Sequence, residues 1–400
     1  MRIAIIGGGI GGLTAALALR QFGFEPEIFE QAPELLEVGA AILMWPNAMR
    51  VLHRLGLSEA VRQRGALLKQ TLWLRHDGRE IKRFPLPKTD EPPVALHRAE
   101  LQELLVEALP RESIHLGHVF DKFEQRQSDM LAHFTNGAAN ECDVLIGADG
   151  LHSHVRAQLL GDGPPADRGY VAWRGVAPKA PKSLPPASAI EIHGKGQRFG
   201  IGPLGFGKVG WWCSINQSHE VHEISREAAS PEEHAPLRER LAQLFDGWCE
   251  PVNELIQTTP LTALVRNPVF DRPPVRKWGG GSVTLLGDAI HPTTPNLGQG
   301  GCLAIEDAVV LARCLSQYAS NPQTGKRVDA IQSALRRFES LRFSRTAMVA
   351  RLSRVYGAVG QWENPAAIDL RSWLLSTIPP SVVQRVLRWT FDYDAYDVNI

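Results

Sequence analysis

The chain has 400 residues, of which 44% are apolar and 22% are charged, so it can form two or three globular domains with sizeable cores. Its 43 Lys and Arg residues balance its 43 Asp and Glu residues, which excludes a global field that would attract nucleic acid or an anionic membrane. The 5 cysteines lack a paired Cys-x-x-Cys spacing and no apolar run is long enough to span a membrane, so we expect a cytoplasmic protein without disulfides or a metal site.

The N-terminal segment is typical of a nucleotide-binding βαβ unit. A strand is expected at 3–6, a helix at about 9–22 and a second strand near 27–30 that ends on Glu30, and between the first two lies the pattern G-x-G-x-x-G. In this pattern Gly7 permits a tight turn, Gly9 lets the backbone approach a pyrophosphate, and Gly12 lets the helix pack on the strand. The helix N-terminus would face the phosphates and Glu30 the ribose hydroxyls. The pattern predicts a dinucleotide site and does not by itself distinguish FAD from NAD.

The middle of the chain contains two kinds of sequence pattern, one typical of antiparallel strands and one typical of alternating helices and strands. Residues 71–84 alternate like a hairpin around Asp77-Gly78, and residues 168–216 contain strand-like runs broken by Gly and Pro. Between them the sequence predicts a helix at about 98–109 and then four strands, near 113–116, 119–123, 131–134 and 143–146. A second helix begins near Ser153. We therefore expect an α/β domain with a parallel sheet, interrupted by a second, mostly antiparallel sheet.

The C-terminal part is predicted to be largely helical. A strand near 282–286 precedes helices at about 298–316 and 336–354, and the last 40 or so residues look like short amphipathic helices that cap the core. The helix at 336–354 is rich in Arg, and we expect it to present a solvated face with Glu339 among the arginines.

Two further strings decide the nucleotide. Residues 141–156 read ECDVLIGADGLHSHVR, and residues 287–308 read GDAIHPTTPNLGQGGCLAIEDA. Asp288 follows a buried strand, where an unpaired carboxylate is costly unless a polyol such as the ribityl chain of FAD satisfies it. The glycines at 298, 300 and 301 open a helix whose dipole would stabilise negative charge on a reduced flavin. With His97-Arg98, these strings resemble the single-component flavin monooxygenases, which include aromatic-ring hydroxylases, over roughly residues 1–350.

The resemblance implies an FAD-binding Rossmann-like domain built from residues 1–70, 98–165 and 275–340, a substrate-binding domain from 71–97 and 166–274, and a C-terminal helical region at 341–400. It implies FAD as cofactor, NADH or NADPH as transient co-substrate, and hydroxylation of an aromatic or heteroaromatic substrate by O2 through a flavin C4a-hydroperoxide. The expected partners are therefore a small molecule and O2, with no nucleic acid, in a monomer or homodimer. The residues it assigns to the cofactor are Gly7, Gly9, Gly11, Gly12, Glu30, Gln31, Arg98, Asp288, Gly298, Gln299, Gly300 and Gly301.

Within the family, the strings Val38–Asn47, Gly169–Gly175 and Pro295–Gly301 look most similar to urate hydroxylases and zeaxanthin epoxidases. By this resemblance Pro295 lies beside the reactive C4a edge, and Arg198 is the substrate-binding Arg of the urate branch. The partner tyrosine of that branch falls at Gly210, which counts against urate. Trp173, on a predicted strand, is expected on the wall of the substrate pocket, with a place in the core as the alternative.

The resemblance leaves several functions open. A halogenase is disfavoured because its Trp-x-Trp-x-Ile-Pro element is missing at Trp211-Trp212, and a disulfide reductase is disfavoured because the first cysteine is Cys142. An isoprenoid or polyene epoxidase, a flavin oxidase or reductase without oxygen insertion, and a non-catalytic flavin-binding sensor remain as alternatives.

Overall fold

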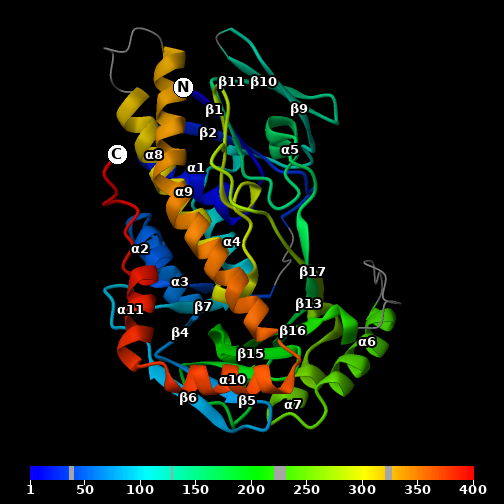
Figure 1. Ribbon diagram of the computed structural model, residues 1–400. Coiled ribbons are helices and arrows are strands. Elements are labelled where there is room, and N and C mark those ends of the chain that lie inside the picture. The colour runs from blue at the N-terminus through cyan, green and yellow to red at the C-terminus, as the bar shows by residue number, and fades with distance from the viewer. Residues whose placement is uncertain (36–39, 128, 220–230, 320–326) are drawn as a thin grey trace.

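The computed structural model describes residues 1–35, 40–127, 129–219, 231–319 and 327–400. A parallel sheet with its helices occupies one end of the molecule and a larger sheet the other, and the helix α9 (Arg327–Gly360) runs along both (Figure 1). This arrangement confirms the predicted α/β class with a second, interrupting sheet and C-terminal helices.

The parallel sheet is assembled from segments that are far apart in sequence. Every residue of its strands β12 and β18 is buried, as expected for a sheet covered on both faces. The helix α1 (Ile10–Gln21) follows the first strand and packs against α8 (Gly300–Ala319). The strands are, in spatial order, β18 (Val283–Leu285), β12 (Val144–Gly147), β1 (Arg2–Ile6), β2 (Glu25–Phe29) and β8 (Ile114–His115).

Two small sheets flank this core. One is a ribbon of β9 (Phe120–Gln125), β10 (Met130–Phe134) and β11 (Ala139–Cys142), beside the helix α5 (His154–Leu160). In the other, β7 (Val94–His97) pairs with β3 (Ala41–Met44) and β4 (Ala66–Leu67), and not with the large sheet. The helices around this second sheet are α2 (Pro46–Arg54), α3 (Ser58–Arg64) and α4 (Arg98–Glu107).

The large sheet has two unlike faces. One face buries Trp173, Phe199 and Trp211 in a core with α6 (Pro231–Leu244) and α7 (Val252–Thr258), two helices for which the sequence analysis made no prediction. Because side chains alternate along a strand, Arg174, Arg198 and Trp212 lie on the other face. The strands are, in spatial order, β17 (Val265–Asp271), β13 (Ala166–Ala177), β16 (Val209–Asn216), β15 (Gln197–Pro203), β14 (Ser188–His193), β5 (Gln70–Arg75) and β6 (Glu80–Pro85).

Pairing within this sheet is antiparallel except between β14 and β5. The hairpin predicted at 71–84 is confirmed as β5 and β6. The division of the chain into an FAD-binding and a substrate-binding domain at the residues given above stays a prediction.

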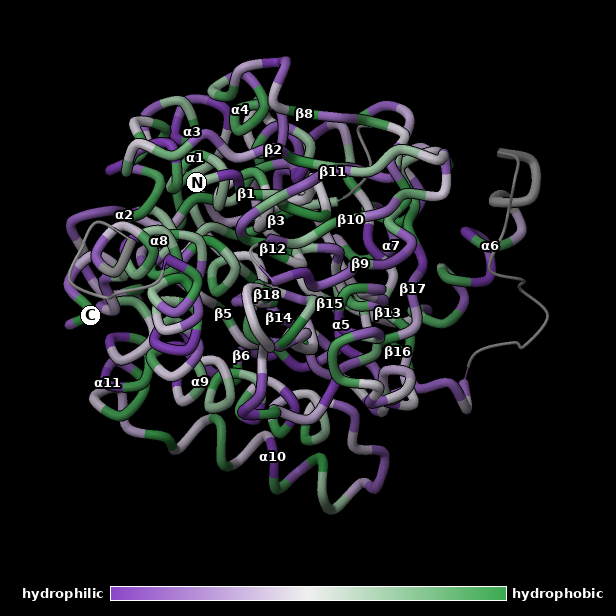
Figure 2. The backbone as a smooth tube through the Cα atoms, turned by 90° about the horizontal axis from the view of Figure 1, so that it is seen from above, coloured by the Kyte–Doolittle hydropathy of each residue, from purple (hydrophilic) through white to green (hydrophobic). Residues whose placement is uncertain are grey.

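The C-terminal helices close one side of the molecule. Asn364 caps α10 (Pro365–Thr377) by accepting hydrogen bonds from the N–H groups of Ala366 and Ala367, and α11 (Pro380–Phe391) follows. Both helices lie at the edge of the molecule and alternate between hydrophobic and hydrophilic residues (Figure 2). In the part of the chain that the structure describes, no helix is long and apolar enough to span a bilayer.

The prediction of a solvated face on the Arg-rich helix is wrong for its central residues. Arg342 is fully buried, Arg345 is 8% exposed and Glu339 is 5% exposed. The physical reason is that α8 presents the buried carboxylates of Glu306 and Asp307 directly opposite α9, so that these arginines have ionic partners inside the protein.

Candidate functional site

In the first glycine motif, Gly7 and Gly12 are required by the packing of the protein itself, whereas Gly9 borders open space. Gly7 has φ of +110°, and a Cβ there would lie 2.4 Å from the carbonyl oxygen of Ala148. A Cβ on Gly12 would lie 2.0 Å from the carbonyl oxygen of Gly7, so close packing of α1 on β1 requires glycine there. At Gly9 a Cβ would meet nothing within 4 Å. Since no side chain caps α1 at Gly9, the backbone there is open to a phosphate at the helix N-terminus.

Glu30, just after β2, is fixed next to this turn. Its carboxylate accepts hydrogen bonds from the N–H of Gly8 at 2.6 Å and of Ala32 at 2.9 Å. Gln102 on α4 donates to the carbonyl of Gly8 at 3.3 Å. Each Glu30 oxygen keeps a further lone pair for a ribose hydroxyl. The neighbouring Gln31 is exposed.

Arg98 and Asp288 lie across the same site. Burial lowers the pKa of the Arg98 guanidinium, while the carboxylates of Asp288 and Glu30 act in the opposite direction, so the three charged groups lie near one another. The Asp288 side chain is solvent-accessible, yet the surrounding protein raises the pKa of its carboxyl by desolvation. Among the described residues no hydrogen bond reaches this carboxylate. The space next to this accessible but desolvated carboxylate is called the recess below, and Asp288 can accept a ligand hydroxyl there.

The string at 287–308, called the third motif below, contains Asp288 and continues the site beyond it. Pro295 begins a short turn and is exposed, and Gly298 follows with φ of +61°. A Cβ on Gly300, where α8 begins, would lie 3.8 Å from the Asp288 carboxylate, and one on Gly301 would lie 3.1 Å from Ile42. The N-terminus of α8 therefore lies close to Asp288.

The side chain of Gln299 points away from the recess, because it is 2% exposed and its Oε1 accepts from Asn47 at 3.1 Å. Gly11, the remaining glycine assigned to the cofactor, is a packing residue. A Cβ there would lie 2.9 Å from Leu286 and 3.2 Å from Ala304.

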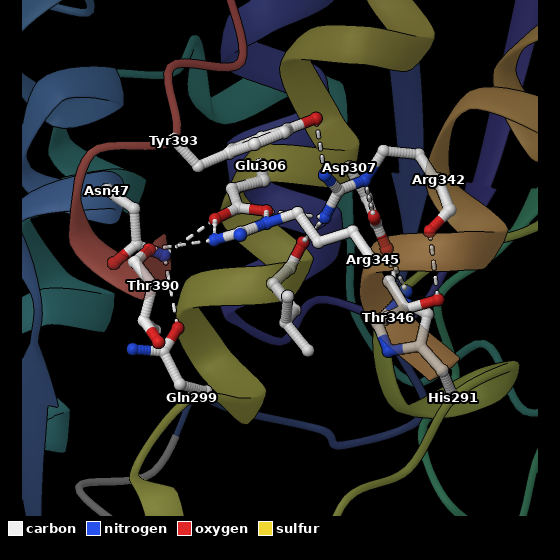
Figure 3. Close-up of polar contacts among 12 residues, drawn as sticks. Asn47, His291, Gln299, Glu306, Asp307, Arg342, Arg345, Thr346, Thr390 and Tyr393 are labelled. Atoms are coloured by element: carbon white, nitrogen blue, oxygen red, sulfur yellow. Dashed lines mark hydrogen bonds and ion pairs between the residues drawn. The ribbon is translucent and has the colours of Figure 1, made fainter. Parts of the chain in front are cut away.

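Behind this loop lies a buried ionic cluster that the sequence analysis missed (Figure 3). Arg342 donates to Asp307 at 2.6 Å, to Glu306 at 2.6 Å and to the Tyr393 hydroxyl at 2.7 Å. Arg345 contacts both oxygens of Glu306 at 2.6 and 2.7 Å. Asp307 also pairs with His291 at 2.5 Å. The cluster joins α8, α9, the C-terminal segment and the loop after Asp288, so it holds the loop of the third motif in place.

The charges in this cluster are matched. Burial alone would raise the pKa values of Glu306 and Asp307, but Arg345 and Arg342 lower that of Glu306, and His291 and Arg342 lower that of Asp307, below the usual range. Glu306 and Asp307 belong to the string that carried the resemblance, but nothing in the sequence showed that α9 supplies their partners.

The string at 141–156 contacts the residues that follow Asp288. The Asp149 carboxylate accepts from the N–H of His154 at 2.8 Å and of Val155 at 3.1 Å, which fixes the start of α5. Arg156 is fully buried and donates to the carbonyl of Ile290 at 2.7 Å. This string therefore supports the residues after Asp288 and does not line the recess through Arg156.

Arg198 connects the large sheet to the loop of the third motif. Its guanidinium is fully buried and donates to Glu191 at 3.0 Å, to Gln361 at 3.3 Å and to Asn296, the residue after Pro295. Asn296 in turn donates to the Tyr170 hydroxyl at 3.1 Å. Arg198 thus reaches the loop next to Pro295, with most of its donors used by the protein itself.

Trp173 is not brought together with Arg198 and Pro295. It is 4% exposed and lies in the core with α7, on the face of the sheet opposite to Arg198. The core alternative stated for this residue fits its position. Trp212, which pairs across the strands with Arg174, is only partly buried and lies on the same face as Arg198. The alternation of Trp211 and Trp212 along β16 was the available signal for this difference.

The remaining strings lie near the same site. Of the string Val38–Asn47, residues 38 and 39 lie outside the described residues. Trp45 stacks on Phe391 of α11 at 4.6 Å between ring centroids, and Gly298 lies against its indole nitrogen. A Cβ on Gly210 would lie 2.5 Å from that of Ala41, so a larger side chain at 210 would displace β3.

Comparison with known proteins finds relatives along the whole chain. Residues 1–338 match a family model described as FAD binding domain. Aurachin C monooxygenase/isomerase of Stigmatella aurantiaca is 38% identical over 382 residues, 94% of either chain. 3-Amino-4-hydroxybenzoate 2-monooxygenase of Streptomyces cremeus is 36% identical and covers 88% of this chain and 86% of that protein. The structure of Klebsiella pneumoniae HpxO with FAD and uric acid superposes with a TM-score of 0.86 at 29% identity, over 98% of this chain and 96% of that one.

Proposed function

The chain belongs to the family of FAD-dependent aromatic-ring monooxygenases, and from this premise we propose that it uses NADH or NADPH and O2 to hydroxylate an aromatic or heteroaromatic small molecule. The observation that carries the proposal is the proximity of the first glycine motif, Glu30, Arg98 and Asp288. The balanced reaction consumes NAD(P)H, a proton and O2, places one oxygen atom in the substrate and releases the other as water. Bound FAD would supply the redox chemistry, accepting a hydride and activating O2.

The chain's own residues would hold and orient this cofactor. The N–H groups at the start of α1 would face the pyrophosphate, Glu30 would accept from the ribose, and Asp288 would accept from a ribityl hydroxyl. The N-terminus of α8 would place its positive dipole end near developing negative charge. Arg198 would act as a positioning residue, since its hydrogen bond to Asn296 fixes the turn that carries Pro295.

The names of relatives support a planar ring substrate. Hydroxybenzoate, hydroxynicotinate and urate appear in the names of enzymes 30 to 36% identical to this chain, and all are planar ring compounds. Urate itself is disfavoured for this chain, because Gly210, where the tyrosine of the urate branch falls, packs against Ala41. A zeaxanthin epoxidase of Solanum lycopersicum is 32% identical over 89% of this chain and 54% of its own length, so epoxidation is the second candidate.

Rapid mixing of the anaerobically reduced holoprotein with oxygen tests the proposal. We expect a C4a-hydroperoxide spectrum before oxidised flavin returns, and NAD(P)H oxidation that a ring compound accelerates. Direct return to oxidised flavin with stoichiometric hydrogen peroxide, with candidate ligands present, would indicate an oxidase. An epoxide product from a polyene would indicate the epoxidase, and purification without FAD would refute the proposal. The cytoplasmic location and the monomer or homodimer stay predictions.

A further inference from the structure

We infer that Arg174 binds an anionic oxygen of the substrate, such as a carboxylate or enolate oxygen, while the indole of Trp212 forms the flat surface on which the substrate ring lies. The inference rests on the proposed function, because it names the substrate class of that same site.

The two side chains are neighbours on one face of the large sheet. Arg174 of β13 and Trp212 of β16 lie directly opposite each other in antiparallel register, which brings their Cβ atoms to within about 5.5 Å. Both are partly buried, whereas Trp173 and Trp211 on the other face are 4% and 1% exposed. Arg174 and Trp212 therefore border accessible space on the face that carries Arg198.

The Arg198 guanidinium lies over the Trp212 ring, 5.4 Å from the ring centroid, and the open space on this face of the sheet is at Gly202. A Cβ on Gly200, opposite Trp212 on β15, would lie 2.1 Å from the indole, so the indole lies flat against the backbone of β15. Gly202, two residues along the same face, would place a Cβ in open space with nothing within 4 Å. Aromatic rings prefer stacked contact with a flat indole of this kind.

The guanidinium of Arg174, next to Trp212, has no anionic partner among the described residues. Within the described residues its guanidinium makes no hydrogen bond and no ion pair, whereas Arg98 is faced by Asp288 and Glu30. Burial and then the nearby Arg98 lower the pKa of Arg174. A half-buried cation next to a second cation is costly, and an anionic ligand oxygen offsets that cost through charge-assisted hydrogen bonds.

Two anions could fill this role, a substrate oxygen or a group of FAD itself. The observations favour the substrate, because Arg174 belongs to the large sheet beside Trp212, while the residues that line the cofactor recess come from α1, α4 and the loop before α8.

The test uses the FAD-loaded protein and matched probes that differ in charge. The pairs are 4-hydroxybenzoate with 4-hydroxybenzamide, and 4-hydroxy-2-quinolone with 4-methoxy-2-quinolone. Dissociation constants come from calorimetry and from the change in the flavin spectrum. The variants are Arg174→Met and Trp212→Leu, with Arg83→Met on the exposed edge strand β6 as the control.

We expect the unaltered protein to bind the anion of at least one pair about ten- to a hundredfold more tightly than its neutral partner. Arg174→Met removes this preference and leaves the FAD content and the affinity for the neutral partner unchanged. Trp212→Leu weakens both members of the pair alike, and Arg83→Met changes neither.

Three results would overturn the inference: a preference retained in Arg174→Met, loss of FAD from that variant, which assigns Arg174 to the cofactor, or no preference for any anion in the unaltered protein. None of them affects the proposed function, which fails separately if the purified protein lacks FAD or does not oxidise NAD(P)H with any ligand.

Discussion

Replacing Arg342 by Met tests whether the ionic cluster holds the third-motif loop. The change keeps an unbranched, flexible side chain and removes the guanidinium that contacts Asp307, Glu306 and Tyr393. It leaves Glu306 with Arg345, and Asp307 with His291. Both carboxylates are fully buried, so each loses a partner that water cannot replace.

Breaking a buried ion pair by removing one partner costs about 3–5 kcal/mol of unfolding free energy. At about 2.1 cal/mol/K of unfolding entropy per residue, 400 residues give roughly 0.84 kcal/mol/K. The midpoint of thermal unfolding should therefore fall by about 4–6 °C.

The loss should depend on pH. The pKa values of Glu306 and Asp307 are lowered in the folded protein, so their contribution to stability is present above the unfolded pKa values of about 4 and is lost as the pH falls through the folded values. Without Arg342, burial raises the pKa values of Glu306 and Asp307 in the folded variant. The variant therefore loses most unfolding free energy at pH values where both carboxylates must be charged. The difference in midpoint should be larger at about pH 7.5 than at about pH 5.

Differential scanning calorimetry of both proteins across this pH range makes the measurement. Arg351→Met is the matched control, since Arg351 is exposed on the same helix. If Arg342→Met unfolds within about 1 °C of the control, or if the difference is the same at both pH values, the cluster does not support the loop as argued.

The other predictions concern the recess and the sheet. Gly9→Ala should weaken FAD binding at least about tenfold and leave the apoprotein midpoint unchanged, whereas Gly12→Ala, whose Cβ would lie 2.0 Å from a carbonyl oxygen, should cost at least about 1–3 kcal/mol of stability; FAD titration and calorimetry separate the two. Asp288→Ala should weaken FAD binding about tenfold or more by removing the acceptor for the ribityl chain, and equal affinity by fluorescence titration would contradict that role. Trp173→Phe should lower the free energy of unfolding by about 1–3 kcal/mol with an unchanged KM, since the ring lies in the core, and a raised KM at unaltered stability would return Trp173 to the pocket.

Much of the cofactor site can be predicted from short stretches of sequence, because it depends on steric contacts between residues of the same short segment. A glycine that must turn at positive φ, such as Gly7, and one that must let a helix approach a strand, such as Gly12, are set by backbone sterics over a few residues. The strand before Asp288 is a fully buried run, and in a parallel sheet its carboxyl end lies at the same edge as that of the strand before Glu30.

The substrate side depended on tertiary structure. Whether Trp173 or Trp212 faces the ligand is a matter of which face of the large sheet α7 covers, and one residue of register exchanges the two faces. Sequence alternation shows that Trp211 and Trp212 differ but cannot say which of them is buried.

The sequence by itself determined the family and its FAD cofactor, through the resemblance of its motif strings, and it also predicted the βαβ start, because steric and periodic rules act between near neighbours. Only the tertiary structure decided which charges meet. Arg342 and Arg345 resemble any solvated helical arginines until α8 brings Glu306 and Asp307 against them, and Arg174 is distinctive because no carboxylate in the described chain pairs with it. Long-range pairing of charges is fixed by how the elements pack, and the residues that form each pair lie too far apart in the chain for their spacing to encode it.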